Sequence, residues 1–182
     1  MQTFLPFKSF AKSAKALDNK RLNKQVLEAY QILKVLNNPD PHAAWRNHPA
    51  VKMWRGYEKL FWNYILEMVL EANRRGIKTD KNMENLSALR NATEQNWGIE
   101  IPEWYRNEST MTRLTTTHQF NLYRKDPTYY YQFGLAKLSE YNKPCCQDKK
   151  TPCQYFWVTH EMSYNEVASY TQMACTARTA RI

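Results

Sequence analysis

The sequence predicts a compact, single-domain, all-α fold with irregular loops and a C-terminal tail. Apolar residues recur every three or four positions in long stretches, whereas the alternation typical of half-buried strands is scarce. Proline and glycine separate these stretches and so indicate where helices end. The chain has 182 residues and a mass of 21.7 kDa, which suits one domain with a tail.

The first helix is expected over residues 15–36, after an irregular basic arm formed by residues 1–16. Its apolar stripe consists of Leu22, Val26, Ala29, Leu33 and Leu36. Prolines at positions 39 and 41 end this helix, because proline cannot continue the ladder of helical hydrogen bonds.

Further helices are expected downstream. The second begins at Pro49, with His48 as its cap, and ends at the stop signal Arg74-Arg75-Gly76. A weaker pattern predicts a helix over residues 81–95. Another is expected over residues 109–125, with a serine or threonine cap at its start.

Composition excludes several classes of protein. Only four glycines occur, and no two lie close enough for a phosphate-cradling loop, which argues against P-loop and Rossmann nucleotide enzymes. No apolar run approaches the length of a membrane span, and the first 30 residues are rich in lysine. We therefore expect no membrane partner, no secretory signal and a cytoplasmic location.

The charge balance points to a polyanionic partner. The net charge is +9, the isoelectric point is near 9.4, and aromatic residues make up 14% of the chain. Basic residues mixed with tyrosines suit contacts with phosphates and unstacked bases, so nucleic acid is the expected partner. The alternative is that the positive charge only keeps the protein soluble.

All four cysteines lie in the last quarter of the chain, which is expected to form an extension over residues 142–182 packed on a domain of residues 1–141. No disulfide framework holds the core, which suits a reducing compartment. Cys145, Cys146, Cys153 and His160 are residues of the types that bind zinc, but the paired CxxC spacing of zinc modules is absent. We expect ordinary thiols, no metal and no cofactor.

Glu28 is the carboxylate that the first helix places at the edge of its buried stripe. It shares a ridge with Arg21, Gln25 and Ile32, spaced at i, i+4, i+7 and i+11. The simple alternative is an exposed pair with Lys24, four residues earlier. Residues 1–34 hold seven cations and two acids, so a carboxylate there opposes phosphate binding and needs a chemical reason.

Four segments together resemble a known family. These are the stretch from Leu17 to Glu28, the stretch from Asn47 to Glu58, the Arg75-Gly76 helix end, and the block from Ile101 to Gly134. They resemble the pyrimidine-dimer DNA glycosylases, the phage endonuclease V group, in the same order over roughly residues 1–140.

The resemblance implies a metal-free helical monomer that acts on double-stranded DNA with damaged pyrimidines. It implies N-glycosylase and abasic-site lyase activity on cyclobutane dimers, with an N-terminal α-amine that forms an imine with C1′ of the sugar. Glu28 falls on the assisting glutamate of the family, and residues 129–133 on the segment that contacts the lesion strand. The resemblance also implies that the DNA is kinked and that a base opposite the lesion is extruded.

The catalytic candidates are Met1, Gln2 and Glu28. Gln2 is bulky where the well-known phage member has a small residue after its initiator methionine, and such bulk blocks removal of Met1. The reacting amine is therefore expected to be that of Met1, and removal would instead expose Gln2. Arg21 stands where that member has histidine.

The candidates for DNA contact are basic, polar or aromatic. They are Lys20, Arg21, Lys24, Gln25, Arg55, His118, Asn121, Arg124, Lys125, Tyr129, Tyr130 and Tyr131. For His118 a core position is the alternative, because it shares a helical face with apolar residues. Two other functions stay open: the same chemistry on another damaged or modified pyrimidine, and a DNA-binding protein without catalysis.

Overall fold

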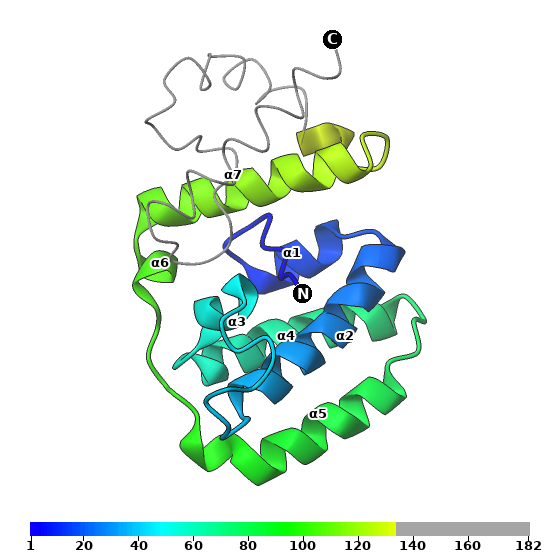
Figure 1. Cartoon of the computed structure of the whole chain (residues 1–182). Coiled ribbons are helices and arrows are strands. Elements are labelled where there is room, and N and C mark those ends of the chain that lie inside the picture. The colour runs from blue at the N-terminus through cyan, green and yellow to red at the C-terminus, as the bar shows by residue number, and fades with distance from the viewer. Residues whose placement is uncertain (134–182) are drawn as a thin grey trace.

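The computed structural model describes residues 1–133, and this part of the chain is all-α, as predicted (Figure 1). Its elements are α1 (Phe10–Ala16), α2 (Asn19–Leu36), α3 (Pro49–Trp54), α4 (Glu58–Arg74), α5 (Asp80–Thr93), η1 (Glu94–Asn96), α6 (Glu103–Arg106), α7 (Glu108–Lys125) and η2 (Tyr131–Phe133). Over the same residues no helix is long and apolar enough to span a membrane. The expected extension over residues 142–182, with its cysteines, lies outside the described residues.

The expectation of an irregular arm followed by one helix from residue 15 is wrong. The arm contains α1, and the chain breaks at Leu17 and Asp18 before α2 begins. Asp18 is the N-cap of α2, and its Oδ1 accepts a hydrogen bond from the backbone N–H of Arg21 at 2.9 Å.

The expected second helix is in fact two, α3 and α4, separated by a turn at Gly56. Gly56 has a φ of 81°, a left-handed conformation that favours glycine. The buried carboxylate of Glu58 fixes this turn, because it accepts hydrogen bonds from the N–H groups of Gly56 and Gly98, each at 2.9 Å. The loop before α6 is thereby joined to the start of α4.

The later helices lie close to their expected positions. Helix α5 covers most of residues 81–95, and α7 ends at Lys125 as expected. The cap of α7 is Asn107 rather than Ser109 or Thr110, since its side chain accepts a hydrogen bond from the N–H of Thr110 at 3.0 Å. A short helix, α6, lies between α5 and α7, where no helix was expected.

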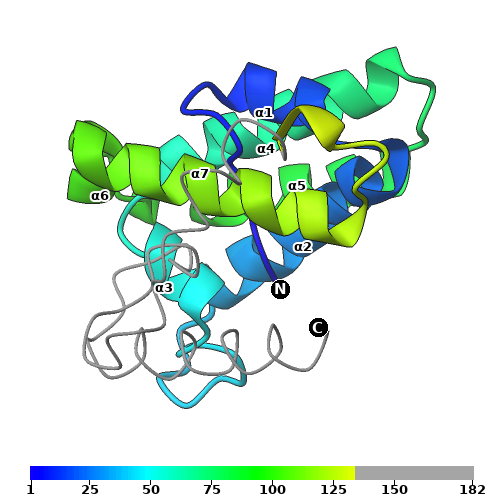
Figure 2. The same cartoon turned by 90° about the horizontal axis from the view of Figure 1, so that it is seen from above.

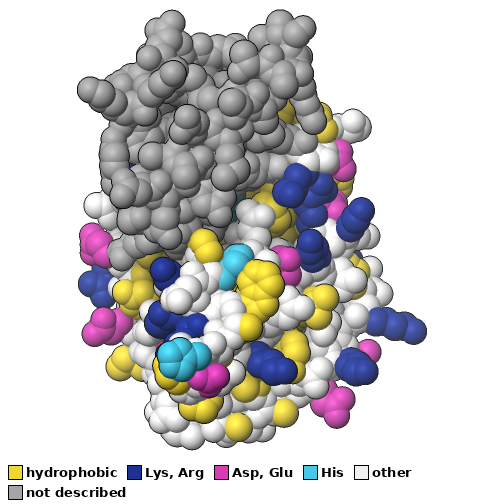
Figure 3. Space-filling view, viewed as in Figure 1, with side chains coloured by type: hydrophobic (Ala, Val, Ile, Leu, Met, Phe, Trp, Pro, Cys, Tyr) yellow, Lys and Arg dark blue, Asp and Glu magenta, His cyan; other side chains and the backbone are white. Residues whose placement is uncertain are grey.

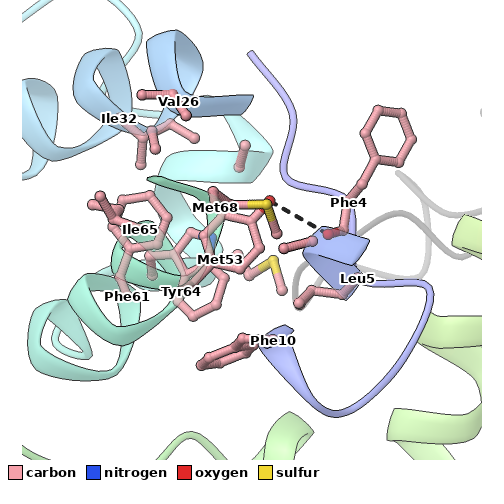
Figure 4. Packing of buried hydrophobic residues seen from close by; sticks show 14 of the residues in the cluster. Phe4, Leu5, Phe10, Val26, Ile32, Met53, Phe61, Tyr64, Ile65 and Met68 are labelled. Carbon is pink, nitrogen blue, oxygen red and sulfur yellow. Dashed lines mark hydrogen bonds between the residues drawn. The ribbon is translucent and has the colours of Figure 1, made fainter. Parts of the chain in front are cut away.

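The core lies between α2 and α4, with α5 on one side and α7 on the opposite side (Figures 1 and 2). Helix α4 packs against both α1 and α2, and α5 packs against α2. The N-terminal segment contributes Phe4 and Leu5 to this core. Leu5 lies near Met53, and the carbonyl of Phe4 accepts a hydrogen bond from the Tyr64 hydroxyl at 3.3 Å, while the Phe4 ring points away from Tyr64 (Figure 4). The chain start is therefore part of the packed interior.

Arg75 joins the end of α4 to the turn between α1 and α2. Its guanidinium donates to the carbonyl of Leu17 at 2.6 Å and to that of Lys15 at 2.8 Å, and it pairs with Glu71 at 2.6 Å. Hydrogen bonding from Arg74, together with that from Arg75, outweighs burial and lowers the pKa of Glu71 to about 2. This network fixes the point at which α2 starts.

Gly98→Ala should destabilise the fold by about 3 kcal/mol, because an added Cβ would lie 1.8 Å from the carbonyl oxygen of Gly56. Gly76→Ala is the control, since its Cβ would meet no atom within 4 Å and only the φ of 72° opposes it. That cost is about 1 kcal/mol. Urea unfolding measures both, and equal losses would contradict the close approach of the two loops.

Candidate active site

The first residues of the chain are held from two sides by buried side chains. The backbone N–H of Phe4 donates to Gln25 Oε1 at 2.8 Å, and that of Leu5 donates to His118 Nδ1 at 2.6 Å. Residues 3–6 are buried. Because both acceptors sit on long helices, α2 and α7, the direction of the chain start is fixed by the helix packing.

Thr3 ties the same segment to α3. Its hydroxyl accepts a hydrogen bond from the indole N–H of Trp54 at 3.2 Å and lies 3.7 Å from the sulfur of Met53. The segment therefore runs between α2 and α3, and the N-terminus lies beside them (Figures 1 and 2).

Glu28 meets the second residue of the chain. Its Oε2 accepts hydrogen bonds from the backbone N–H of Gln2 and from Gln25 Nε2, both at 3.2 Å, and Gln25 Nε2 also donates to the carbonyl of Gln2 at 3.1 Å. Glu28 is only 9% exposed, as expected for the edge of the stripe. Lys24 lies 3.6 Å from the other carboxylate oxygen.

The Met1 amine is close to this carboxylate by covalent geometry. Successive backbone nitrogens lie at most about 3.7 Å apart, so the amine is within about 7 Å of Glu28 Oε2. The side chain of Met1 is partly buried and packs against the core.

His48 is a neighbour that the sequence indicated only as a cap. It is the N-cap of α3, and its Nδ1 accepts a hydrogen bond from the N–H of Ala50 at 3.1 Å. Burial lowers the pKa of His48, the positive N-terminal amine lowers it further, and the charge of Glu28 opposes both. His48 thus lies within electrostatic reach of both the amine and the carboxylate.

A pocket of about 250 Å³ opens beside the chain start; we call it the N-terminal pocket. Its lining residues are Gln2, Phe4, Lys20, Arg21, Lys24, Glu28 and Lys125. Lys and Arg side chains gather on this face between α2 and α7 (Figure 3). Four cations around one acid favour an anionic ligand, and phosphate is the anion that such a groove suits.

Arg21 lines this pocket but is held by neighbours. It pairs with Asp18, lies 3.8 Å from Asp126, and its guanidinium stands 5.3 Å from the ring centroid of Tyr130. The hydroxyl of Tyr130 donates to Asp18 at 2.6 Å. Burial raises the pKa of Asp18, but hydrogen bonds from Tyr130 and Arg21 outweigh it, so the pKa is lowered overall.

Three of the expected DNA-contact residues are core residues, and their expected roles are corrected. Gln25, His118 and Tyr130 are at most 1% exposed, and each bonds within the fold as described above. Such side chains cannot reach a DNA strand on the surface. Their burial depends on contacts between distant segments, which a local pattern does not reveal.

The other expected residues have exposed or partly exposed positions where the structure describes them. Lys20, Lys24, Lys125, Arg55, Tyr129 and Tyr131 are exposed, and Asn121 is partly buried. Arg55 donates to the carbonyl of Arg46 and is not among the residues lining the N-terminal pocket. The side chain of Arg124 lies outside the described part of the structure.

The arrangement brings together an amine, a carboxylate and several cations. A neutral amine is a nucleophile, and a carboxylate beside it is suited to stabilise positive charge or to move a proton. Residues 1–133 contain no group of three or more histidine, cysteine or acidic side chains placed to share a metal ion.

Part of the chain matches a known protein family. Residues 1–85 match the family model described as pyrimidine dimer DNA glycosylase. This range contains Met1, Gln2 and Glu28. No curated protein and no solved structure matches the chain.

His118→Gln should weaken the pH dependence of stability. Burial lowers the pKa of His118 from 6.5 to about 3, so between these values the unfolded state binds a proton that the native state does not. Stability therefore falls as the pH drops below 6.5, by about 1.4 kcal/mol per pH unit. The free energy of unfolding in urea is measured at pH 5 and at pH 6. Its change per pH unit should be smaller in His118→Gln than in the wild type by about 1.4 kcal/mol.

The exposed His42 provides the control for this measurement. A His42→Gln protein should keep the wild-type slope. An unchanged slope in His118→Gln would show that the ring is protonated inside the fold and that the contact with Leu5 N–H is wrong.

Proposed function

We propose that the protein is a DNA repair glycosylase that also acts as an abasic-site lyase, because its first 85 residues match the family model described as pyrimidine dimer DNA glycosylase. Its nucleophile is the α-amine of Met1, and Glu28 assists. The observation that carries this proposal is the hydrogen bond from the backbone N–H of Gln2 to the Glu28 carboxylate, because it brings the chain start to a buried acid.

In the first step the amine lone pair attacks C1′ of the damaged nucleotide. The bond from C1′ to the base breaks, and the base leaves with that electron pair and takes up a proton. The bond from C1′ to the ring oxygen then opens, the nitrogen gives up a proton and the ring oxygen takes one up, which leaves an imine between C1′ and the amine nitrogen. Glu28 is placed to stabilise the positive charge that develops on the sugar.

In the second step a proton leaves C2′ of the imine. The electrons of that C–H bond form a double bond to C3′, and the bond from C3′ to the phosphate oxygen breaks, which cuts the strand. Glu28 is the acceptor that we assign to the C2′ proton, because it is the one acid among the residues lining the N-terminal pocket. Water then hydrolyses the imine and releases the amine.

A chain-terminal amine suits this chemistry better than a lysine. In general α-amines titrate near pH 7.8 and lysines near 10.4, so at neutral pH a far larger fraction of an α-amine is unprotonated. The lysines of the N-terminal pocket, Lys20, Lys24 and Lys125, are assigned to phosphate contacts instead. We assign the exposed rings of Tyr129 and Tyr131 to the protein surface that contacts DNA.

Glu28→Gln should reduce the rate of strand cleavage by at least about 100-fold on dimer-containing duplex, because it removes the charge and keeps the shape. Its side-chain oxygen can still accept the Gln2 N–H, so the chain start keeps its position. Cleavage is measured on end-labelled duplex under single-turnover conditions. Glu84→Gln, the same change at an exposed site on α5, should cleave like the wild type. Full activity of Glu28→Gln would contradict the catalytic role of Glu28.

Lys24→Ala should reduce the salt dependence of DNA binding. The side chain of Lys24 is 67% exposed at the N-terminal pocket. Loss of one phosphate contact lowers the slope of log K against log salt by about 0.9. Titrations from 50 to 200 mM salt measure this slope. Lys34→Ala, an exposed position in the last turn of the same helix, should leave the slope unchanged. Equal slopes for both variants would show that Lys24 makes no contact with a DNA phosphate.

A further inference from the structure

Trp45 is the exception among the tryptophans of residues 1–133. Its exposed fraction is 63%, whereas Trp54, Trp62, Trp97 and Trp104 are each 6% exposed or less. An indole left in water contributes little burial to the fold. The side chain therefore calls for a role outside core packing.

The backbone at Trp45 is strained. It has a φ of 69°, and in residues 1–133 no other non-glycine residue has a positive φ. A bulky residue in this region is a true outlier, and such strain persists only where the surroundings fix it. The side chain is thus held in a conformation that costs free energy.

Hydrogen bonds within the loop around Trp45 hold this backbone conformation. The carbonyl of Trp45 accepts a hydrogen bond from the N–H of His48 at 2.8 Å, and the N–H of Arg46 donates to the carbonyl of Ala43 at 3.2 Å. The guanidinium of Arg46 reaches back to the carbonyl of Asn38 at 3.0 Å. The loop is therefore an ordered platform that presents the indole to solvent.

The platform lies beside the chain start. The indole and the His48 ring have centroids 5.5 Å apart with an interplanar angle of 56°. His48 caps α3, the helix that holds Thr3 through Trp54, and it senses the charges of the N-terminal amine and of Glu28. Trp45 therefore packs against a ring that caps α3 and lies within electrostatic reach of the N-terminal amine and Glu28.

We propose that Trp45 is a base-stacking residue. Its indole stacks on a nucleobase that leaves the duplex when the DNA bends over the N-terminal amine. This inference rests on the proposed function, since attack at C1′ requires an unstacked nucleotide. An exposed aromatic face is what such a base needs, because every nucleobase has a π face. The neighbouring cations Arg46 and Arg55, joined by a hydrogen bond, match the phosphates that flank the base.

The test is binding to a duplex that carries a tetrahydrofuran abasic analogue, which cannot form an imine. Trp45→Ala should bind this duplex about tenfold to 100-fold more weakly than the wild type does. Its affinity for undamaged duplex and its salt slope should stay the same, because no phosphate contact is lost. Trp45→Phe should restore most of the affinity, since it keeps an aromatic face.

Trp45→Gly separates stacking from folding. Glycine adopts a φ of 69° without strain, so this variant should unfold at a higher urea concentration than the wild type and still lose affinity for the abasic duplex. Ile99→Ala, at another exposed apolar side chain (73% exposed), should bind like the wild type. Wild-type affinity in Trp45→Ala and Trp45→Gly, or an equal loss on undamaged duplex, would overturn the stacking role.

Borohydride trapping on a true abasic site distinguishes this inference from the proposed function. If the wild type forms the trapped adduct and the Trp45 variants bind the abasic-analogue duplex as well as the wild type does, only the stacking role is overturned. If the wild type forms no trapped adduct but its affinity for the abasic-analogue duplex depends on Trp45, only the catalytic assignment is overturned and the stacking role is supported.

Discussion

The hydrogen bond between the Gln2 N–H and Glu28 is the contact on which the rest of the site depends. Gln25 reinforces it by donating to both Glu28 and the carbonyl of Gln2. These groups are largely removed from water, so each must find a partner within the fold or cost free energy. The chain start is therefore both a structural part of the core and the carrier of the proposed nucleophile, and helix packing fixes the position of both.

Local patterns predicted the features that depend on one helix. The edge position of Glu28 followed from the period of α2, because neighbours on a ridge are set by residues three and four apart. The turn at Gly56 was missed, because Gly98 lies forty residues after Glu58, the side chain that binds both glycines, and because the apolar period continues across the turn. Charge alone also did not reveal that Asp18 holds Arg21, or that Lys20 and Lys125 share one pocket.

Burial of polar residues marks the other limit of sequence reasoning. His118 and Tyr130 lie in segments that look suited to DNA, yet both serve the N-terminal half of the fold: His118 binds the N–H of Leu5, and Tyr130 binds Asp18. The contact of α7 with the chain start explains His118, and the contact of the segment after α7 with the start of α2 explains Tyr130. Conversely, Trp45 would pass for a core residue by composition, and its exposure and strained φ emerge only in three dimensions.

The most direct measurement identifies the nitrogen that bonds to the sugar. The protein is reduced with borohydride on an abasic duplex, digested, and the peptide that carries the sugar is sequenced by mass spectrometry. The account predicts that the sugar sits on the α-nitrogen of Met1, the residue that the Gln2 contact places near Glu28. A sugar found on a lysine of the N-terminal pocket would contradict it.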